Sequence, residues 1–255
     1  FTPRRAQHKE GPRGAIKILL PAIPAIRTNQ QYLLFEWALP ARDDFPLAHK
    51  AEGFTTKENK SMFQIRIHGR GGQGVVSAAE MLSVAAFLEG KYAQAVPSFG
   101  SERMGAPVVA FCRIDDKPIR LREPVLEPDT LIVQDPTLFN AIDLFNGLTD
   151  SGYLLVNTGK SIEALGIQNA VAHLPAGHVC SVPATDIALT HVKRPVPNAV
   201  LLGALAAVTG VIKIDSVVEA IETKFPGKVG QANINAARVA YEMVRTPVLQ
   251  EVANA

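Results

Sequence analysis

From residue 63 onward, apolar and polar residues follow two repeats that predict alternating strands and helices. Apolar residues at every second position are typical of strands, and apolar residues three or four apart are typical of helices. The first pattern predicts strands at residues 63–67, 92–96, 108–114, 130–133, 153–156 and 178–182, and the second predicts helices at 75–88, 198–210, 215–225 and 232–244. This alternation predicts an α/β fold, with a mostly parallel mixed sheet flanked by helices in a Rossmann-like three-layer sandwich.

Proline and aspartate residues punctuate these elements. Pro97 is expected to stop the second strand, because proline has no N–H to give to a sheet. Asp115 and Asp116 form a turn signal after the third strand, and residues 118–121 that follow resemble its hairpin partner. A hairpin near residues 108–121 is therefore predicted to make the sheet mixed.

Residues 1–61 differ in character from the rest of the chain. Their periodicity is weak, and basic residues outnumber acidic ones. Two interpretations stay open: a basic tail that tethers the chain to an acidic surface, or an extension, disordered or not native, ahead of a natural start at Met62. We therefore predict an extension over residues 1–61 and a folded domain over residues 62–250.

Composition excludes several classes of function. The formal net charge of +2 gives no case for nucleic-acid binding. Cys112 and Cys180 are far apart, whereas iron–sulfur clusters and structural zinc sites need several closely spaced ligands. No apolar run reaches the roughly 20 residues of a membrane span, and residues 16–26 are broken by Pro21 and Pro24. We expect a cytoplasmic protein with no metal of its own, no membrane span and no nucleic-acid partner.

A glycine-rich turn between the first strand and the first helix, Gly69-Arg70-Gly71-Gly72-Gln73-Gly74, is the clearest candidate binding site. Glycines let the backbone approach an anion, and the helix that follows offers free N–H groups and the positive end of its dipole. The spacing of Gly69, Gly71 and Gly74 also matches the GxGxxG of dinucleotide sites, but the second predicted strand ends without the acid that would hold a ribose. Three interpretations stay open: a dinucleotide, another phosphate-bearing ligand, or a turn that only packs helix on sheet.

A second polar loop, residues 98–107, follows the second predicted strand. In a doubly wound sheet it leaves the same carboxyl edge as the glycine loop, where ligands bind. Arg103 could grip a phosphate or carboxylate with two N–H groups, and Glu102 could orient Arg103 or contact a partner chain. The alternative is an ordinary solvated Glu–Arg pair.

Several segments, in order over residues 62–246, resemble the gamma chain of pyruvate:ferredoxin oxidoreductase. They are FQIRIHGRGGQG (63–74), GKYAQA (90–95), FGSERMGAP (99–107), RIDDKPIRLR (113–122), EPDTLIVQDPTLF (127–139), VPAT (182–185), PVPN (195–198) and FPGK (225–228). The folded domain over residues 62–250 is thereby identified as a gamma-type domain, and residues 1–61 lie outside the resemblance.

The resemblance implies a subunit that turns nothing over by itself. In such a complex a 2-oxoacid is oxidatively decarboxylated on thiamine diphosphate, and the acyl group passes to coenzyme A. Electrons leave through iron–sulfur clusters to ferredoxin or flavodoxin. Partner subunits of the alpha, beta and delta types would complete the complex and carry the thiamine diphosphate and the clusters, and no catalytic residue is expected in this chain.

For this chain the resemblance implies a share of the coenzyme A site. The expected residues are Gly69, Arg70, Gly71, Gly72, Gln73 and Gly74 in the glycine loop, and Ser101, Glu102, Arg103 and Gly105 in the second loop. The N–H groups of Gly71, Gly72 and Gly74, with Arg70 and Arg103, would meet the phosphates. Gln73 would hydrogen-bond the pantetheine arm.

Several points stay open. Met104 stands where a second arginine is expected, which removes one cation, and FGSERMGAP lacks the tyrosine of the 2-oxoglutarate version, which favours pyruvate. The alternatives are the gamma subunit of a 2-oxoglutarate or branched-chain 2-oxoacid enzyme, a free-standing Rossmann-type nicotinamide-binding oxidoreductase, and an assembly scaffold without a ligand. His68 is interpreted as hydrogen-bonded at a strand end, and Asn157 and Thr158 are second-rank ligand candidates.

Overall fold

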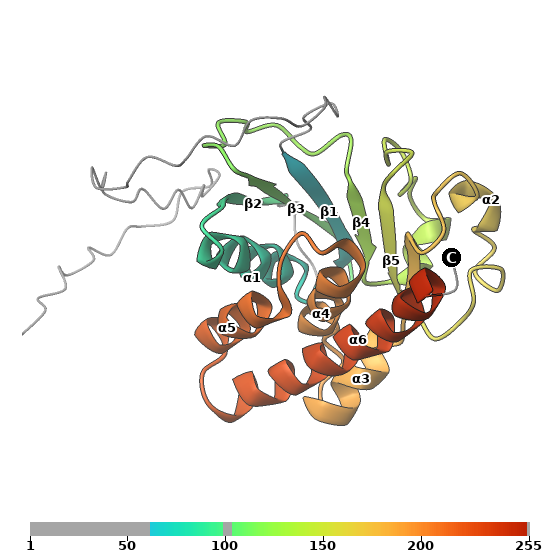
Figure 1. Cartoon of the computed structure of the whole chain (residues 1–255). Coiled ribbons are helices and arrows are strands. Elements are labelled where there is room, and N and C mark those ends of the chain that lie inside the picture. The colour runs from blue at the N-terminus through green and yellow to red at the C-terminus, as the bar shows by residue number, and fades with distance from the viewer. Residues whose placement is uncertain (1–61, 99–103, 254–255) are drawn as a thin grey trace, which may run out of the picture. The chain divides into compact units, whose positions relative to one another are not determined.

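A computed structural model of the chain describes residues 62–98 and 104–253 (Figure 1). Within these residues six strands form one sheet in the order β2-β3-β1-β4-β5-β6. The strands are β1 (Phe63–Arg70), β2 (Tyr92–Ser98), β3 (Pro107–Asp115), β4 (Thr130–Val133), β5 (Tyr153–Asn157) and β6 (Val179–Val182). The α/β class and the strand positions agree with the sequence predictions, and the expected extension over residues 1–61 lies outside the described residues.

The sheet is mixed because one strand, β3, runs against the other five. β1, β4, β5 and β6 pair in parallel, whereas β3 pairs antiparallel with both β1 and β2. β2 therefore points in the same direction as β1 without touching it. The carboxyl ends of β1, β2, β4, β5 and β6 consequently meet at one edge of the sheet, and we call this the carboxyl edge.

The predicted hairpin near residues 108–121 is wrong. The structure has no strand between Asp115 and Thr130, and β3 is joined to β2 instead. A buried cation contacts the segment instead: Arg113 on β3 donates from Nη2 to the backbone oxygen of Glu123 at 2.6 Å. This contact ties the segment after β3 to the sheet by a side chain rather than by a ladder of backbone hydrogen bonds.

Pro97 does not end β2, contrary to the prediction. It lies inside the strand, opposite Ala110 of β3. β2 is the edge strand and has a neighbour on one side only. Proline is tolerated in such a strand because its missing N–H leaves no gap in a ladder.

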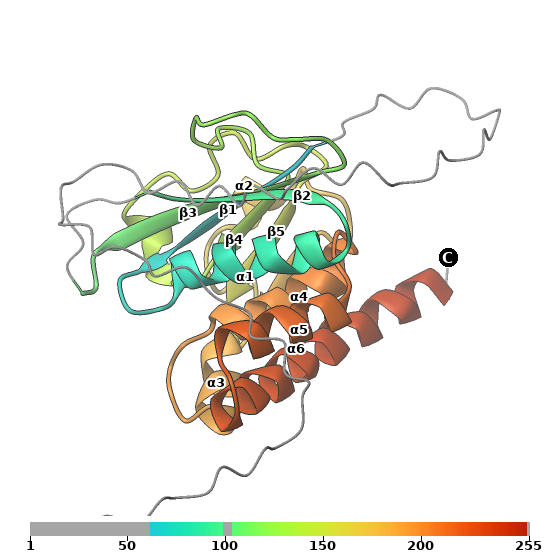
Figure 2. The ribbon, with the colours of Figure 1, turned by 90° about the vertical axis from the view of Figure 1, so that its left-hand side faces the viewer.

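The long helices lie on one face of the sheet, as Figure 2 shows. They are α1 (Val75–Leu88), α3 (Ala184–His191), α4 (Asn198–Thr209), α5 (Ile214–Lys224) and α6 (Lys228–Ala253). The other face is covered by shorter pieces, the 3-10 helix η1 (Pro136–Asn140) and α2 (Gln168–Val171), with their connecting segments. The sequence predicted α1 with its observed bounds, made α6 too short and missed α3.

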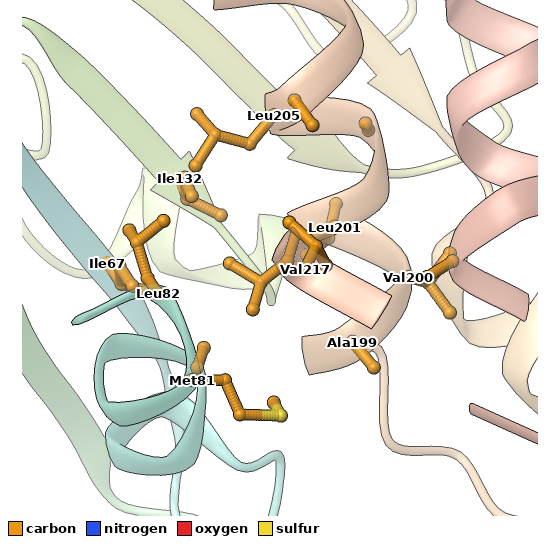
Figure 3. Close-up of a cluster of buried hydrophobic side chains, with 14 of the residues drawn as sticks. Ile67, Met81, Leu82, Ile132, Ala199, Val200, Leu201, Leu205 and Val217 are labelled. Carbon is orange, nitrogen blue, oxygen red and sulfur yellow. The ribbon is translucent and has the colours of Figure 1, made fainter. Parts of the chain in front are cut away.

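The main core lies between the sheet and the long helices. Figure 3 shows part of it, where Ile67 of β1 and Ile132 of β4 face Leu82, Leu205 and Val217 from three helices. Each of these five side chains is buried. A smaller apolar cluster on the opposite face holds Leu131, Val133, Leu154 and Val156 against η1 and α2. Burial on both faces explains why the sequence of β4 and β5 is apolar at nearly every position.

No helix in the described part of the chain combines the length and the apolar character needed to cross a membrane.

Candidate functional site

The glycine loop joins β1 to α1 at the carboxyl edge, as predicted, but it is shorter than expected. Gly69 and Arg70 are the last two residues of β1, so only residues 71–74 form the turn. Gly72 and Gly74 have φ values of +96° and +76°. Residues other than glycine rarely adopt this left-handed backbone conformation. A Cβ at Gly74 would also collide with the side chain of Asn198 of α4.

The second predicted loop does meet the glycine loop. The N–H of Gly71 donates to the oxygen of Ala106 at 2.9 Å, and the N–H of Gly105 donates to the oxygen of Gly71 at 3.2 Å. The Gly71 N–H, which was expected to face a ligand, is therefore used within the chain. Three further candidates in this loop, Ser101, Glu102 and Arg103, lie outside the described residues.

Arg70 is held by the segment that follows β4. Its Nε lies 3.3 Å from Asp135 Oδ2, its Nη2 donates to Thr137 Oγ1 at 2.8 Å, and its Nη1 donates to the oxygen of Gly105 at 3.0 Å. The pKa of Asp135 is lowered although burial opposes the shift, because Thr137, Gln73 and Arg70 all stabilise the carboxylate. These contacts fix the loop to the neighbouring parallel strand. The guanidinium has more N–H groups than they use.

The side chain of Gln73 makes two hydrogen bonds within the chain. Its Oε1 accepts from the N–H of Arg70 at 2.7 Å, and its Nε2 donates to Asp135 Oδ2 at 3.0 Å. The contact of Gln73 with a pantetheine arm stays a prediction, and it would have to use the second N–H of Nε2. Both ends of the carboxamide hold the loop in shape, so it is a positioning residue.

A cleft of about 270 Å³ opens beside the loop and is lined by Arg70, Gly72, Gly74 and the first turn of α1. No acceptor in the described part of the chain takes a hydrogen bond from the N–H of Gly72 or Gly74. The first turn of α1 contains no acidic residue. Free N–H groups, the positive end of a helix dipole and a guanidinium together form a site for an anion.

A second cleft, of about 250 Å³, lies along the carboxyl ends of β4, β5 and β6. Its lining includes Gln134, Asn157, Thr158, Thr185 and Asp186. Asn157, a second-rank candidate from the sequence, ends β5 and contacts the first turn of α3: its Oδ1 accepts from the N–H of Thr185 at 2.9 Å, and its Nδ2 donates to Thr185 Oγ1 at 2.8 Å. Sequence reasoning missed Gln134 and Asp186 as site residues, although the polar run directly after a buried strand was a usable signal.

His68 lies in β1, directly before Gly69. It is buried, and its Nε2 has no hydrogen-bond partner among the described residues. Burial and the nearby Arg66 lower the pKa of His68 to about 4. The imidazole is therefore neutral in the folded protein at neutral pH, and a proton on it would be costly.

This shift predicts an acid-sensitive fold. His68 has a pKa of about 4 when folded and 6.5 as a free group. The unfolded chain therefore binds the proton first, and stability is lost as pH falls from 6.5 toward 4. Lowering the pH from 7 to 5 should reduce the free energy of unfolding by about 2 kcal/mol more in the parent than in His68→Gln. Urea unfolding of both proteins at the two pH values measures the difference, and equal losses would contradict it.

The strand order disfavours the nicotinamide alternative. In dinucleotide-binding folds the second strand pairs in parallel with the first and places an acid beside the glycine loop. Here β3 separates β2 from β1.

Among the described residues, no group of three or more His, Cys, Asp or Glu side chains could hold a metal ion. Cys112 and Cys180 are free, and burial raises their pKa values to about 12 and about 11, which makes them poor nucleophiles.

The fold and the carboxyl edge define an α/β domain in which a glycine loop opens the first helix beside a cleft. The sequence model of the family described as pyruvate ferredoxin/flavodoxin oxidoreductase matches residues 64–243. The chain belongs to this family.

Relatives of the whole domain are known. The chain is 49% identical to pyruvate synthase subunit PorC of Methanothermobacter marburgensis over 184 residues, which are 72% of this chain and 98% of the relative. It is 50% identical to the pyruvate/ketoisovalerate oxidoreductases common subunit gamma of Pyrococcus furiosus, over 71% of this chain and 96% of that one. The crystal structure of pyruvate oxidoreductase subunit PORC from Thermotoga maritima superposes with a TM-score of 0.60 at 43% identity, covering 72% of this chain and 97% of that chain.

Proposed function

We propose that this chain is the gamma-type subunit of a 2-oxoacid:ferredoxin oxidoreductase and that its glycine loop contributes to a coenzyme A site. The subunit role rests on one observation: relatives named as subunits match this chain over nearly their whole length at about half identity. The coenzyme A role rests on the anion site formed by Gly72, Gly74, Arg70 and the start of α1.

The proposed substrate is pyruvate. The relatives' names give pyruvate alone or pyruvate with ketoisovalerate, and one of them is described as a subunit common to two oxidoreductases. A subunit shared in this way would not select the 2-oxoacid. We therefore assign the choice of substrate to partner chains, and a branched-chain 2-oxoacid stays the alternative.

Within the complex this chain would bind and position coenzyme A. Thiamine diphosphate and iron–sulfur clusters would be held by alpha-, beta- and delta-type partners. For the clusters this fits the two cysteines of this chain, Cys112 and Cys180, which lie on different strands and cannot supply a cluster. Those groups supply decarboxylation and electron transfer to ferredoxin or flavodoxin. A cytoplasmic location belongs to this proposal and fits the two free thiols.

Replacing Arg70 with glutamine tests the coenzyme A role. A charge-assisted hydrogen bond to a phosphate would be lost, so we expect the KM for coenzyme A to rise about tenfold. The assay is pyruvate-dependent reduction of an artificial electron acceptor by the complex purified through a tag on this chain. The KM for pyruvate serves as an internal reference and should stay unchanged.

Arg238→Gln is the matched control. Arg238 lies on α6 in an exposed ion pair with Asp215 at 3.2 Å, away from the glycine loop. Its loss should alter neither constant. An unchanged KM for coenzyme A in Arg70→Gln, with the complex intact, would rule out the coenzyme A role. A tagged chain that elutes alone and binds a nicotinamide cofactor would rule out the subunit role.

A further inference from the structure

The cleft at the ends of β4, β5 and β6 contains an unpaired carboxamide. The side chain of Gln134 has no exposed surface, and neither Oε1 nor Nε2 has a hydrogen-bond partner among the described residues. A buried amide without partners is costly, and such groups are rare in folded proteins. Gln134 is among the residues that line the cleft, but its side chain has no exposed surface, so a bound group would reach Oε1 and Nε2 only if the side chain turned toward the cleft.

The position of Gln134 is determined by its backbone. Its N–H donates to the oxygen of His68 at 2.7 Å, and its oxygen accepts from Asn157 Nδ2 at 2.7 Å. A Cβ on Gly69 would lie 3.1 Å from the Cβ of Gln134, so the two strands touch here. The backbone of Gln134 is therefore fixed, and only rotation of the side chain can bring its amide to a partner. The neighbouring amide of Asn157 is already engaged at the start of α3.

The charges around this cleft do not suit a phosphate. No lysine or arginine is among its described lining residues, whereas Asp135 and Asp186 are. The negative charge of Asp135 is already compensated by its ion pair with Arg70. The free carboxamide needs one donor and one acceptor, side by side, from its partner. A neutral group with a donor–acceptor edge meets that need, and an amide or an amino-substituted heterocycle has such an edge.

The two clefts lie on either side of the glycine loop. Gln73 lines the polar cleft, while Gly72 and Gly74 line the anion cleft. We propose that Gln134 binds a neutral donor–acceptor edge of the same ligand whose phosphates rest on the glycine loop. This inference rests on the proposed function. In coenzyme A that edge belongs either to a pantetheine amide or to the adenine base.

Gln134→Leu in the purified complex tests the inference. Leucine has a similar size and lacks the polar atoms, so we expect the KM for coenzyme A to rise about tenfold. The free energy of unfolding should stay equal or increase, because an unpaired buried group is removed. A fall in stability would show that the amide has a structural partner and would overturn the proposal.

Thr130→Val is the matched control. Thr130 is at the start of β4, is fully buried and has an unpaired Oγ1, but it lies at the opposite end of the strand from the cleft. Its substitution should leave the KM for coenzyme A unchanged. An equal rise in both variants would overturn the proposal, because the effect would then come from disturbing β4.

Adenosine 3′,5′-bisphosphate, as a competitive inhibitor, distinguishes the two sources of the edge. An unchanged inhibition constant in Gln134→Leu, with a raised KM for coenzyme A, assigns the contact to a pantetheine amide. A raised inhibition constant assigns it to adenine. If Gln134→Leu changes neither constant while Arg70→Gln raises the KM, the cleft holds only water and this inference fails alone. If neither substitution has an effect, the proposed function fails as well.

Discussion

Replacing Gly203 with alanine is expected to destabilise the protein by about 3 kcal/mol, although alanine is the better helix former. Gly203 lies in the middle of α4, where α4 crosses α6. A Cβ at this position would collide with the backbone oxygen of Ala237. A backbone carbonyl cannot rotate away as a side chain can, so the helices must move apart. Chemical unfolding of the two proteins measures the loss.

Ala207→Gly provides the matched comparison in the same helix. Ala207 is partly buried beside the core, so its loss tests helix propensity with little change in packing. We expect a cost of about 1 kcal/mol. If Gly203→Ala were neutral or stabilising, α4 and α6 would not pack as closely as the structure shows.

Replacing Arg66 with methionine is expected to cost about 3 kcal/mol, the loss typical of removing a buried charged group from its partners. Arg66 is buried in β1, and its Nη2 donates to the oxygens of Leu144 and Asn146 at 2.8 and 2.6 Å. Its Nη1 reaches the oxygens of Val125 and Leu126 at 3.4 Å. Burial lowers the pKa of Arg66, and Asp143 opposes this shift. One side chain therefore holds two separate segments against the sheet.

The substitution should loosen both segments. Hydrogen exchange of residues 123–126 and 144–146 should rise before that of the strands, because only those segments lose their partners. Arg66→Lys should recover part of the stability, since an ammonium can reach fewer oxygens than a planar guanidinium. A loss of stability spread evenly over the sheet, with no local increase in exchange, would contradict this assignment.

Much of the candidate site followed from local sequence. The glycine loop was predicted between a strand and a helix, and α1 was predicted with its observed bounds, because Gly74 and Gly90 flank it with φ values of +76° and +77°. The role of Gln73 was not predictable. Its partner Asp135 follows a strand that is distant in sequence, and only strand pairing brings the two together.

The sequence by itself determined the secondary structure pattern, the glycine loop and the family, because these depend on neighbouring residues and on motif order. Only the tertiary structure decided the strand order, the insertion of β3 between β2 and β1, and the contact of Asn157 with the first turn of α3. It also brought Gln134 and Asp186 into one cleft. These features depend on contacts between residues far apart in the chain. Periodicity shows that a residue is buried, but it does not identify the strand or helix that buries it.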